Sequence, residues 1–216
     1  MSSSYPKIRI LLVDDHAIVR AGFRYILESE GEYDIKEVNT AEEACSVYND
    51  FKPDVVVMDL VMPGMGGLEG VRHIYAKDNK ANILVLSMQD VPLYIERARH
   101  AGAKGYITKR SVPQELNKAV AAIVKGQAYF STDISPGTRL KVTSKDDNEK
   151  LSGLSEREFE IFCLMAQGQS VVTISNSLHL SPKTVSNHRT RIMQKLQANS
   201  LVEITRLAIR HGLIEA

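Results

Sequence analysis

The sequence predicts an α/β fold, in which a doubly wound, five-stranded parallel sheet is followed by a small all-α domain. Short aliphatic runs without polar alternation recur in the first half of the chain. Such runs are typical of strands that a parallel sheet buries on both faces. Amphipathic helical patterns separate the runs, as they do in βαβ units. From residue 154 onward the pattern is wholly helical.

Strand patterns alternate with helical patterns along the first part of the chain, which predicts a sheet with right-handed crossovers. The strands are expected at 8–13, 35–38, 54–58, 83–87 and 105–108. The helices are expected at 16–29, 41–51, 67–77, 92–101 and 112–125. Pro92 and Pro113 fit the first turn of a helix, where a missing N–H costs little. Gly102 and Gly126 stand where helices should stop.

The last third of the chain contains helix signals at short intervals. Ser155 and Glu158 occupy the reciprocal positions of a capping box, which opens a helix reaching about residue 166. Further helices are expected at 171–178, 182–197 and 200–210. Residues 127–150 are polar, rich in turn formers and without periodicity, as is typical of a linker. We therefore expect a first domain at 1–126, a linker at 127–150 and a helical domain at 151–216.

The composition is that of an ordinary globular protein, with 44% hydrophobic residues, 25% charged residues and a net charge of +1. These values exclude disorder for most of the chain. The first residues lack an apolar core and no apolar run approaches the length of a membrane span, so we expect a cytoplasmic protein without a membrane partner. Cys45 and Cys163 fall in amphipathic helical patterns and are expected to be small buried side chains, not a disulfide or metal pair.

Chemically active residues follow directly after several strand patterns. They are Asp14, Asp15, Asp59, Ser87 and Lys109. Ligands of parallel α/β sheets bind beyond the carboxyl ends of the strands, so these side chains are expected at one edge. Taken singly, each has an ordinary explanation, such as a helix cap for Asp14 or a solvated surface position for Lys109. Taken together, those explanations require a coincidence at each strand end.

These residue types suit phosphoryl chemistry with a divalent cation. Neighbouring carboxylates repel one another, and Mg²⁺ prefers a few carboxylates together with water and phosphate oxygens. An aspartate beside Mg²⁺ can attack a phosphoryl donor and form an aspartyl phosphate. Lys109 would then neutralise one phosphoryl oxygen, and Ser87 would donate a hydrogen bond to another. The nearby glycines Gly64, Gly66, Gly67 and Gly70 lack the spacing of a nucleotide-binding loop and are expected to form a turn.

Residues 7–126 resemble the receiver domain of two-component response regulators, which has a flavodoxin-like fold. The match lies in Asp14-Asp15, the segment 58–64, Ser87 and the segment 104–109. The resemblance implies that Asp59 accepts a phosphoryl group from a sensor histidine kinase. It also implies a Mg²⁺ site, formed by Asp14, Asp15, Asp59 and the Val61 carbonyl. Ser87 and Tyr106 would form a switch pair. A simple packing role is the alternative for Tyr106.

The predicted helix at 182–197 is amphipathic, with a basic outer side. Val185, His188, Ile192 and Leu196 share the inner stripe by the helical period. The outer side and its margins carry cations and short hydrogen-bonding side chains: Lys183, Thr184, Ser186, Asn187, Thr190, Arg191, Gln194 and Lys195. Such a surface suits the major groove of double-stranded DNA, with the cations on phosphates. A solvated helix face is the alternative. His188 is expected to be a satisfied inward histidine, because no second metal ligand stands at a suitable spacing.

Residues 154–214 resemble the C-terminal helix-turn-helix of LuxR-type regulators, in the segments Leu154–Glu158 and Leu180–His188. With the receiver-like part ahead of it, the chain is identified as a member of the NarL/FixJ family of response regulators. The resemblance implies a scaffold helix at 171–178 and a recognition helix at 181–197. It also implies a homodimer, formed on phosphorylation or DNA binding, to which the last helix contributes around Leu201, Ile204 and Ala208.

The function expected is that of a transcription factor whose DNA binding is switched by phosphorylation of Asp59, and not that of an enzyme. Two alternatives belong to other classes. A Mg²⁺-dependent phosphohydrolase usually has a second carboxylate two residues after its aspartate nucleophile, where this chain has Val61. The second alternative is a DNA-binding protein whose first domain dimerises without phosphorylation. The presence of all three aspartates, Asp14, Asp15 and Asp59, argues against it.

Overall fold

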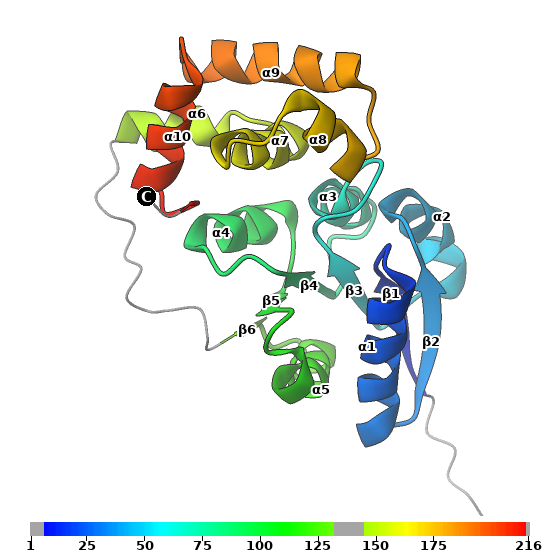
Figure 1. The fold of residues 1–216 in the computed structure, drawn as a ribbon. Helices are drawn as coiled ribbons and strands as arrows, with labels where there is room; N and C mark the ends of the chain where they lie inside the picture. The colour runs from blue at the N-terminus through cyan, green and yellow to red at the C-terminus, as the bar shows by residue number, and fades with distance from the viewer. Residues whose placement is uncertain (1–6, 132–144, 215–216) are drawn as a thin grey trace, which may run out of the picture. The chain divides into compact units, whose positions relative to one another are not determined.

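The computed structural model describes residues 7–131 and 145–214, which divide into an N-terminal and a C-terminal compact unit. The N-terminal unit contains an all-parallel, six-stranded sheet in the order β2-β1-β3-β4-β5-β6 (Figure 1). The strands are β1 (Ile8–Val13), β2 (Tyr33–Val38), β3 (Val55–Asp59), β4 (Ile83–Ser87), β5 (Gly105–Thr108) and β6 (Tyr129–Phe130). The carboxyl ends of β1, β3, β4 and β5 therefore lie next to one another along one edge.

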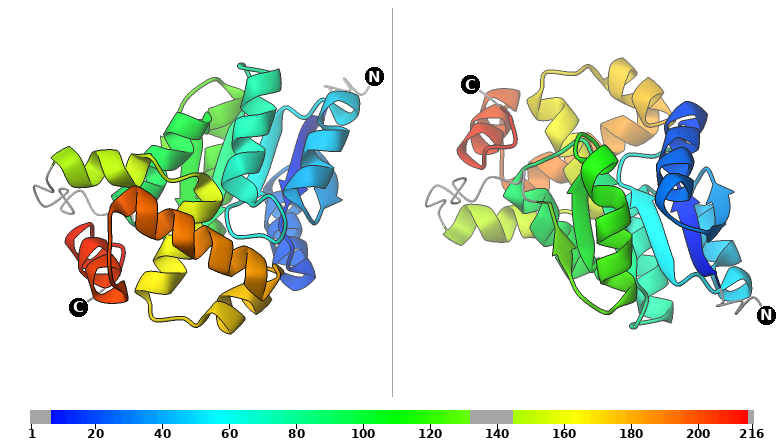
Figure 2. Two further views of the ribbon diagram at one scale, coloured as in Figure 1. Left: turned by 90° about the horizontal axis from the view of Figure 1, so that it is seen from above. Right: turned by 90° about the horizontal axis from the view of Figure 1, so that it is seen from below.

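Helices cover both faces of this sheet (Figure 2). They are α1 (Ala17–Glu30), α2 (Ala41–Phe51), α3 (Gly67–Lys77), α4 (Pro92–Ala101) and α5 (Val112–Val124). Successive strand residues alternate between two cores. Leu11 and Val13 join the core beneath α2, α3 and α4, whereas Ile10 and Leu12 join the core beneath α1 and α5. Burial on both faces explains the unbroken aliphatic runs and confirms the doubly wound fold.

The sheet has one strand more than the five predicted. Strand β6 pairs with β5 inside the range expected to be a linker. The N–H of Tyr129 donates to the Lys104 carbonyl at 3.1 Å, and the N–H of Ser131 donates to the Tyr106 carbonyl at 2.9 Å. A two-residue strand is too short to show a hydrophobic period, so it left no pattern to read.

A helix also begins in the range predicted to be a linker. Helix α6 (Lys145–Ser152) has a strongly polar sequence, with Leu151 fully buried near its end. One apolar anchor does not produce an amphipathic stripe, which explains why the helix was missed. The remaining part of the predicted linker, 132–144, lies outside the described residues.

Within residues 145–214, the C-terminal unit is built of helices. After α6 come α7 (Glu156–Ala166), α8 (Val171–Ser177), α9 (Pro182–Leu196) and α10 (Leu201–Arg210). These last four begin at serines whose side-chain oxygens accept a backbone N–H of the first turn: Ser155, Ser170, Ser181 and Ser200. At Ser155 the side chain of Glu158 returns the bond, which completes the predicted capping box. Local caps therefore made the helix starts predictable.

Helix α7 is the centre of this unit, and α8, α9 and α10 pack against it. Ile204 and Ala208 of α10 are fully buried. The expectation that these two residues contribute to a dimer is therefore wrong, because their side of α10 faces its own domain. The exposed apolar residues of α10 are Leu201 and Val202, at 40% and 58% exposure.

Two expectations drawn from the composition were that both cysteines are buried and that no helix spans a membrane. Cys45 and Cys163 are both buried and free, as predicted. Within 7–131 and 145–214, every helix is too short or too polar to cross a bilayer.

Candidate functional site

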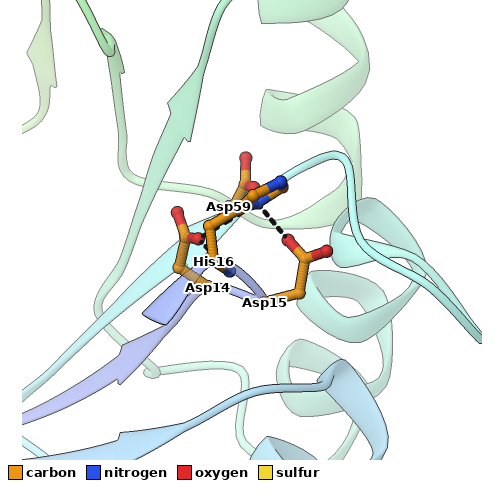
Figure 3. A group of neighbouring side chains, drawn as sticks. All are labelled: Asp14, Asp15, His16 and Asp59. Atoms are coloured by element: carbon orange, nitrogen blue, oxygen red, sulfur yellow. Dashed lines mark hydrogen bonds and ion pairs between the residues drawn. The ribbon is translucent and has the colours of Figure 1, made fainter. Parts of the chain in front are cut away.

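Carboxylates from two neighbouring strands meet at the carboxyl edge of the sheet (Figure 3). Asp14 and Asp15 follow β1, and Asp59 ends β3. Together with His16, they offer ligand atoms that all lie within 4.8 Å of one another. Asp14 is fully buried and Asp59 is 2% exposed. His16 was missed by the sequence analysis, although it follows Asp15 directly; its Nδ1 lies 2.8 Å from Asp15 Oδ1.

Lys109 supplies a positive charge to this acidic pocket. Its Nζ lies 2.8 Å from Asp14 Oδ2 and 2.9 Å from Asp59 Oδ2. Burial disfavours the ammonium ion, but the two carboxylates outweigh this effect and raise the pKa of Lys109. Burial raises the pKa of Asp59 to about 6, against the opposing pull of Lys109. Lys109 thus helps to keep a buried carboxylate ionised at neutral pH, and it is not a merely solvated surface residue.

Ser87 and Tyr106, the expected switch pair, share a backbone partner. Ser87 is fully buried at the end of β4, where its Oγ accepts the N–H of Gln89 at 3.1 Å. The hydroxyl of Tyr106 donates to the Gln89 carbonyl oxygen at 2.8 Å. The Tyr106 ring is fully buried in the core beneath α2, α3 and α4. A buried ring fits both the inward position of a switch residue and the packing role named as the alternative.

The turn between β3 and α3 passes very close to Asp59. The N–H of Val61 lies 3.4 Å from Asp59 Oδ1, and the N–H of Gly67 donates to the Leu60 carbonyl at 2.9 Å. A Cβ atom on Gly67 would stand 1.7 Å from the Asp59 carbonyl oxygen. Gly66 has a φ of +78°, which other residues rarely adopt. Gly64, Gly66 and Gly67 therefore serve this turn, as predicted, and allow α3 to start directly beside the acidic pocket, whereas Gly70 lies inside α3.

The donor set of the acidic pocket suits a hard divalent cation. Asp14, Asp15 and Asp59 provide carboxylate oxygens, which are the ligands that Mg²⁺ prefers. Lys109 brings one positive charge to three carboxylates, so a cation would find the pocket still negative. Mg²⁺ also keeps several waters, which agrees with the partial exposure of Asp15.

Helix α9 presents its two sides as predicted. Val185, Ile192 and Leu196 are buried. Most side chains predicted to contact DNA are exposed: Lys183, Ser186, Asn187, Thr190, Arg191, Gln194 and Lys195. Arg189 is exposed as well; it follows buried Val185 by four positions, so the helical period placed it beside the inner stripe and outside the predicted set. The α9 surface thus offers a basic, hydrogen-bonding side without a carboxylate.

Three α9 residues differ from expectation. Thr184 is half-buried, and its hydroxyl lies 2.8 Å from the Ser181 hydroxyl at the helix cap. The side chain of Lys195 is 43% exposed, as expected, but its Nζ lies 2.6 Å from Glu158 Oε2, so its charge is paired within the domain. His188 is half-buried, its Nδ1 has no hydrogen-bond partner, and burial lowers its pKa. The expectation of a satisfied histidine is therefore wrong, because the ring edge faces the interior of the domain.

Both units match known protein families over most of their length. Residues 10–121 match the response regulator receiver domain. Residues 152–208 match the luxR family of bacterial regulatory proteins. The fold and the acidic pocket therefore define the N-terminal unit as a receiver domain, and the helical unit is a LuxR-type DNA-binding domain.

Similarity extends over almost the whole chain. Over 211 residues the sequence is 40% identical to response regulator UvrY of Escherichia coli strain K12 and covers 97% of each chain. It is 36% identical to response regulator GacA of Pseudomonas aeruginosa over 211 residues, covering 97% of this chain and 99% of that protein. The chain is also similar to a solved structure of RcsB from Salmonella enterica serovar Typhimurium, which is bound to a promoter in the presence of a phosphomimetic. The TM-score is 0.59 at 26% identity, and the match covers 93% of this chain and 98% of that chain. The chain belongs to the NarL/FixJ family of response regulators.

Proposed function

We propose that this response regulator takes a phosphoryl group on Asp59 from a sensor histidine kinase, and that this event controls DNA binding by α9. The observation that carries the proposal is the position of Asp59. Its carboxylate is 2% exposed, lies 2.9 Å from the Lys109 ammonium, and has Asp14 and Asp15 within reach. A nucleophilic carboxylate held between a cation and a metal-binding pair is equipped to form an acyl phosphate.

The transfer can be written from the residues of the pocket. An oxygen of Asp59 attacks the phosphorus of a phosphohistidine, the P–N bond breaks, and the departing imidazole takes up a proton. Lys109 can then exchange its contact with Asp59 for a phosphoryl oxygen. The hydroxyl of Ser87, on the neighbouring strand, can donate to another oxygen. Both movements change the ends of β4 and β5, next to the Gln89 backbone that binds Tyr106.

We propose that the protein is a stoichiometric phosphoryl acceptor and does not turn over external substrates. Val61 stands two residues beyond Asp59, where a phosphohydrolase of the aspartate type needs an acid or base. Its side chain is apolar and 45% exposed, so it cannot move a proton to a leaving group. The acyl phosphate would therefore persist as a signal.

Magnesium would be held by Asp14, Asp15, Asp59 and the Val61 carbonyl, where it neutralises charge on the phosphoryl oxygens. Because the ion binds the folded state, Mg²⁺ should raise the free energy of unfolding by about 1.4 kcal/mol at ten times its dissociation constant. Asp15→Asn should weaken this stabilisation by removing one charged ligand. Thermal unfolding at increasing Mg²⁺ measures it, with the exposed Asp34→Asn as control. Equal stabilisation of Asp15→Asn and the wild type would contradict the site.

For the DNA-binding domain, we propose that α9 enters the major groove and that two copies bind two half-sites about one helical turn apart. The exposed basic side of α9 supports this, as does the similarity to a promoter-bound regulator. Leu201 and Val202 are apolar surface residues available for a homodimer contact. We propose the same two domains and linker as expected from the sequence, with the linker shorter than 127–150 because β6 belongs to the receiver sheet and α6 to the helical unit. A regulator of chromosomal promoters would act in the cytoplasm.

Two α9 side chains should have different effects on DNA binding. Asn187→Ala is expected to cost about 1–3 kcal/mol on the preferred site and to relax base preference at one position, because an amide can read a base edge. Lys183→Ala is expected to weaken binding to all sequences and to lower the salt slope by about one, because a lysine on a phosphate releases one counterion. Selection from randomised DNA and titrations at several salt concentrations measure these effects. Unchanged base preference in Asn187→Ala would refute the assigned reading face.

The proposed function is tested by footprinting a genomic DNA library with and without acetyl phosphate. We expect protected sites to appear or to tighten when the phosphodonor and Mg²⁺ are present. Identical protection in both conditions would favour a phosphate-independent DNA binder instead.

A further inference from the structure

Lys195 lies on the last turn of α9 and was predicted to contact DNA, but its surroundings give it a different role. Its Nζ lies 2.6 Å from Glu158 Oε2 and 3.1 Å from the carbonyl oxygen of Gly153. Both partners belong to the segment that opens α7, more than thirty positions away in the sequence. Lys195 therefore joins the end of the recognition helix to the start of the central helix of the domain.

Glu158 needs a cationic partner because its side chain is only 5% exposed, and a buried carboxylate is costly unless it is paired. The same Oε2 atom accepts the N–H of Ser155 at 2.8 Å, within the capping box of α7. Burial acts to raise the pKa of Glu158, but Lys195 and the Ser155 N–H outweigh it, and the pKa is lowered. The carboxylate is thus charged at neutral pH, and Lys195 is the cation that neutralises it.

The first turn of α7 also holds the scaffold helix. Arg157 donates from its guanidinium to the carbonyl oxygen of Leu178, at the end of α8, at 2.9 Å. Two consecutive residues of α7 therefore contact both helices of the helix-turn-helix. Arg157 binds the end of α8, and Glu158 binds Lys195 at the end of α9. The exposed α9 residues nearest the start of the helix, such as Lys183, lie about 18 Å from this anchor along the helix axis. A small change of angle at the anchor becomes a large displacement there.

We propose that Lys195 is a positioning residue, which sets the angle of α9 through Glu158, and not a phosphate contact. This inference rests on DNA binding by α9 as proposed above. It separates Lys195 from Lys183, although both are cations on the same helix. Both lysine side chains are exposed, Lys195 to 43%, but the ammonium of Lys195 is held by Glu158, and Lys183 lies on the outer side.

The test compares Lys195→Met with Lys183→Met in the full chain by DNA titrations at several salt concentrations. We expect Lys195→Met to lower affinity roughly tenfold, a typical consequence of uncoupling two contacting residues, with an unchanged salt slope. Lys183→Met should lower the slope by about one. Lys195→Arg, which keeps a cation beside Glu158, should restore most of the affinity. A slope reduced by about one in Lys195→Met would overturn the proposal.

A double-mutant cycle shows whether Lys195 acts through Glu158. Glu158→Gln keeps a residue suited to the capping box but removes the charge. If the two residues act together, Glu158→Gln with Lys195→Met should bind DNA no more weakly than the worse single variant. Additive losses would overturn the proposal. Circular dichroism and unfolding of each variant, which need no DNA, report the folded fraction and the coupling in stability. Absence of binding by the folded wild type would instead count against the proposed function.

Discussion

Asp59→Asn is expected to abolish phosphoryl uptake and the response of DNA binding to a phosphodonor. The amide has nearly the volume of the carboxylate but is not a nucleophile for phosphorus at neutral pH. The variant should also be at least as stable as the metal-free wild type. The folded-state pKa of Asp59, about 6, lies above the ordinary value, so stability falls as pH rises between about 4 and 6 and the carboxylate ionises. Asparagine removes that cost. Labelled acetyl phosphate and chemical unfolding at pH 7.5 measure both effects.

The matched control for this experiment is Asp54→Asn. Asp54 stands just before β3, at the opposite end of the strand, where its Oδ2 accepts the N–H of Arg9 at 2.8 Å. It should take up label as the wild type does, because it lies away from the acidic pocket. Uptake by Asp59→Asn equal to that of Asp54→Asn would place the acceptor elsewhere.

Gly67→Ala is expected to cause the largest loss of stability among single methyl additions to this receiver. The new Cβ would lie 1.7 Å from the Asp59 carbonyl oxygen and 2.8 Å from Leu60 Cα, both backbone atoms that cannot rotate away. Relief requires the start of α3 to move off β3, which breaks the Gly67–Leu60 hydrogen bond and shifts the acceptor strand end. We expect the free energy of unfolding to fall by about 3 kcal/mol or more, with reduced phosphoryl uptake.

Gly22→Ala provides the opposite case in the same domain. Gly22 lies in the middle of α1, and nothing stands within 4 Å of its Cβ position. Alanine there should raise the free energy of unfolding by about 0.5–1 kcal/mol, because it favours the helix over the unfolded chain. Urea unfolding of both variants measures the difference. A Gly67→Ala variant as stable as the wild type would show that the close approach at β3 is wrong.

The fold was predictable where local signals were strong. The unbroken aliphatic runs of β1, β3 and β4 and the serine caps of the C-terminal helices placed those elements almost to the residue. The edge strand β2 starts at Tyr33, earlier than expected, because its alternating exposure gives a weaker signal than a buried run. Strand β6 and helix α6 depend on tertiary anchors, Phe130 beneath Arg99 and buried Leu151, which no local period reveals.

The sequence was sufficient to predict which residues form the acidic pocket, but not which contacts they make. Parallel topology alone brings Asp14, Asp59 and Lys109 to one edge, since adjacent strands end side by side. The sequence did not reveal that Lys109 bridges two aspartates or that Tyr106 is already packed in the core. It also did not reveal that Lys195 is paired with Glu158, because that contact depends on how α9 crosses α7.

The most direct test of the account is to locate the phosphoryl group itself. Folded protein incubated with acetyl phosphate and Mg²⁺ can be reduced with borohydride, which converts an aspartyl phosphate to homoserine, and the modified peptide can be sequenced by mass spectrometry. We expect homoserine at position 59 and an unmodified aspartate at positions 14, 15 and 54. Homoserine at another position, or no modification of the folded, magnesium-loaded protein, would contradict this expectation.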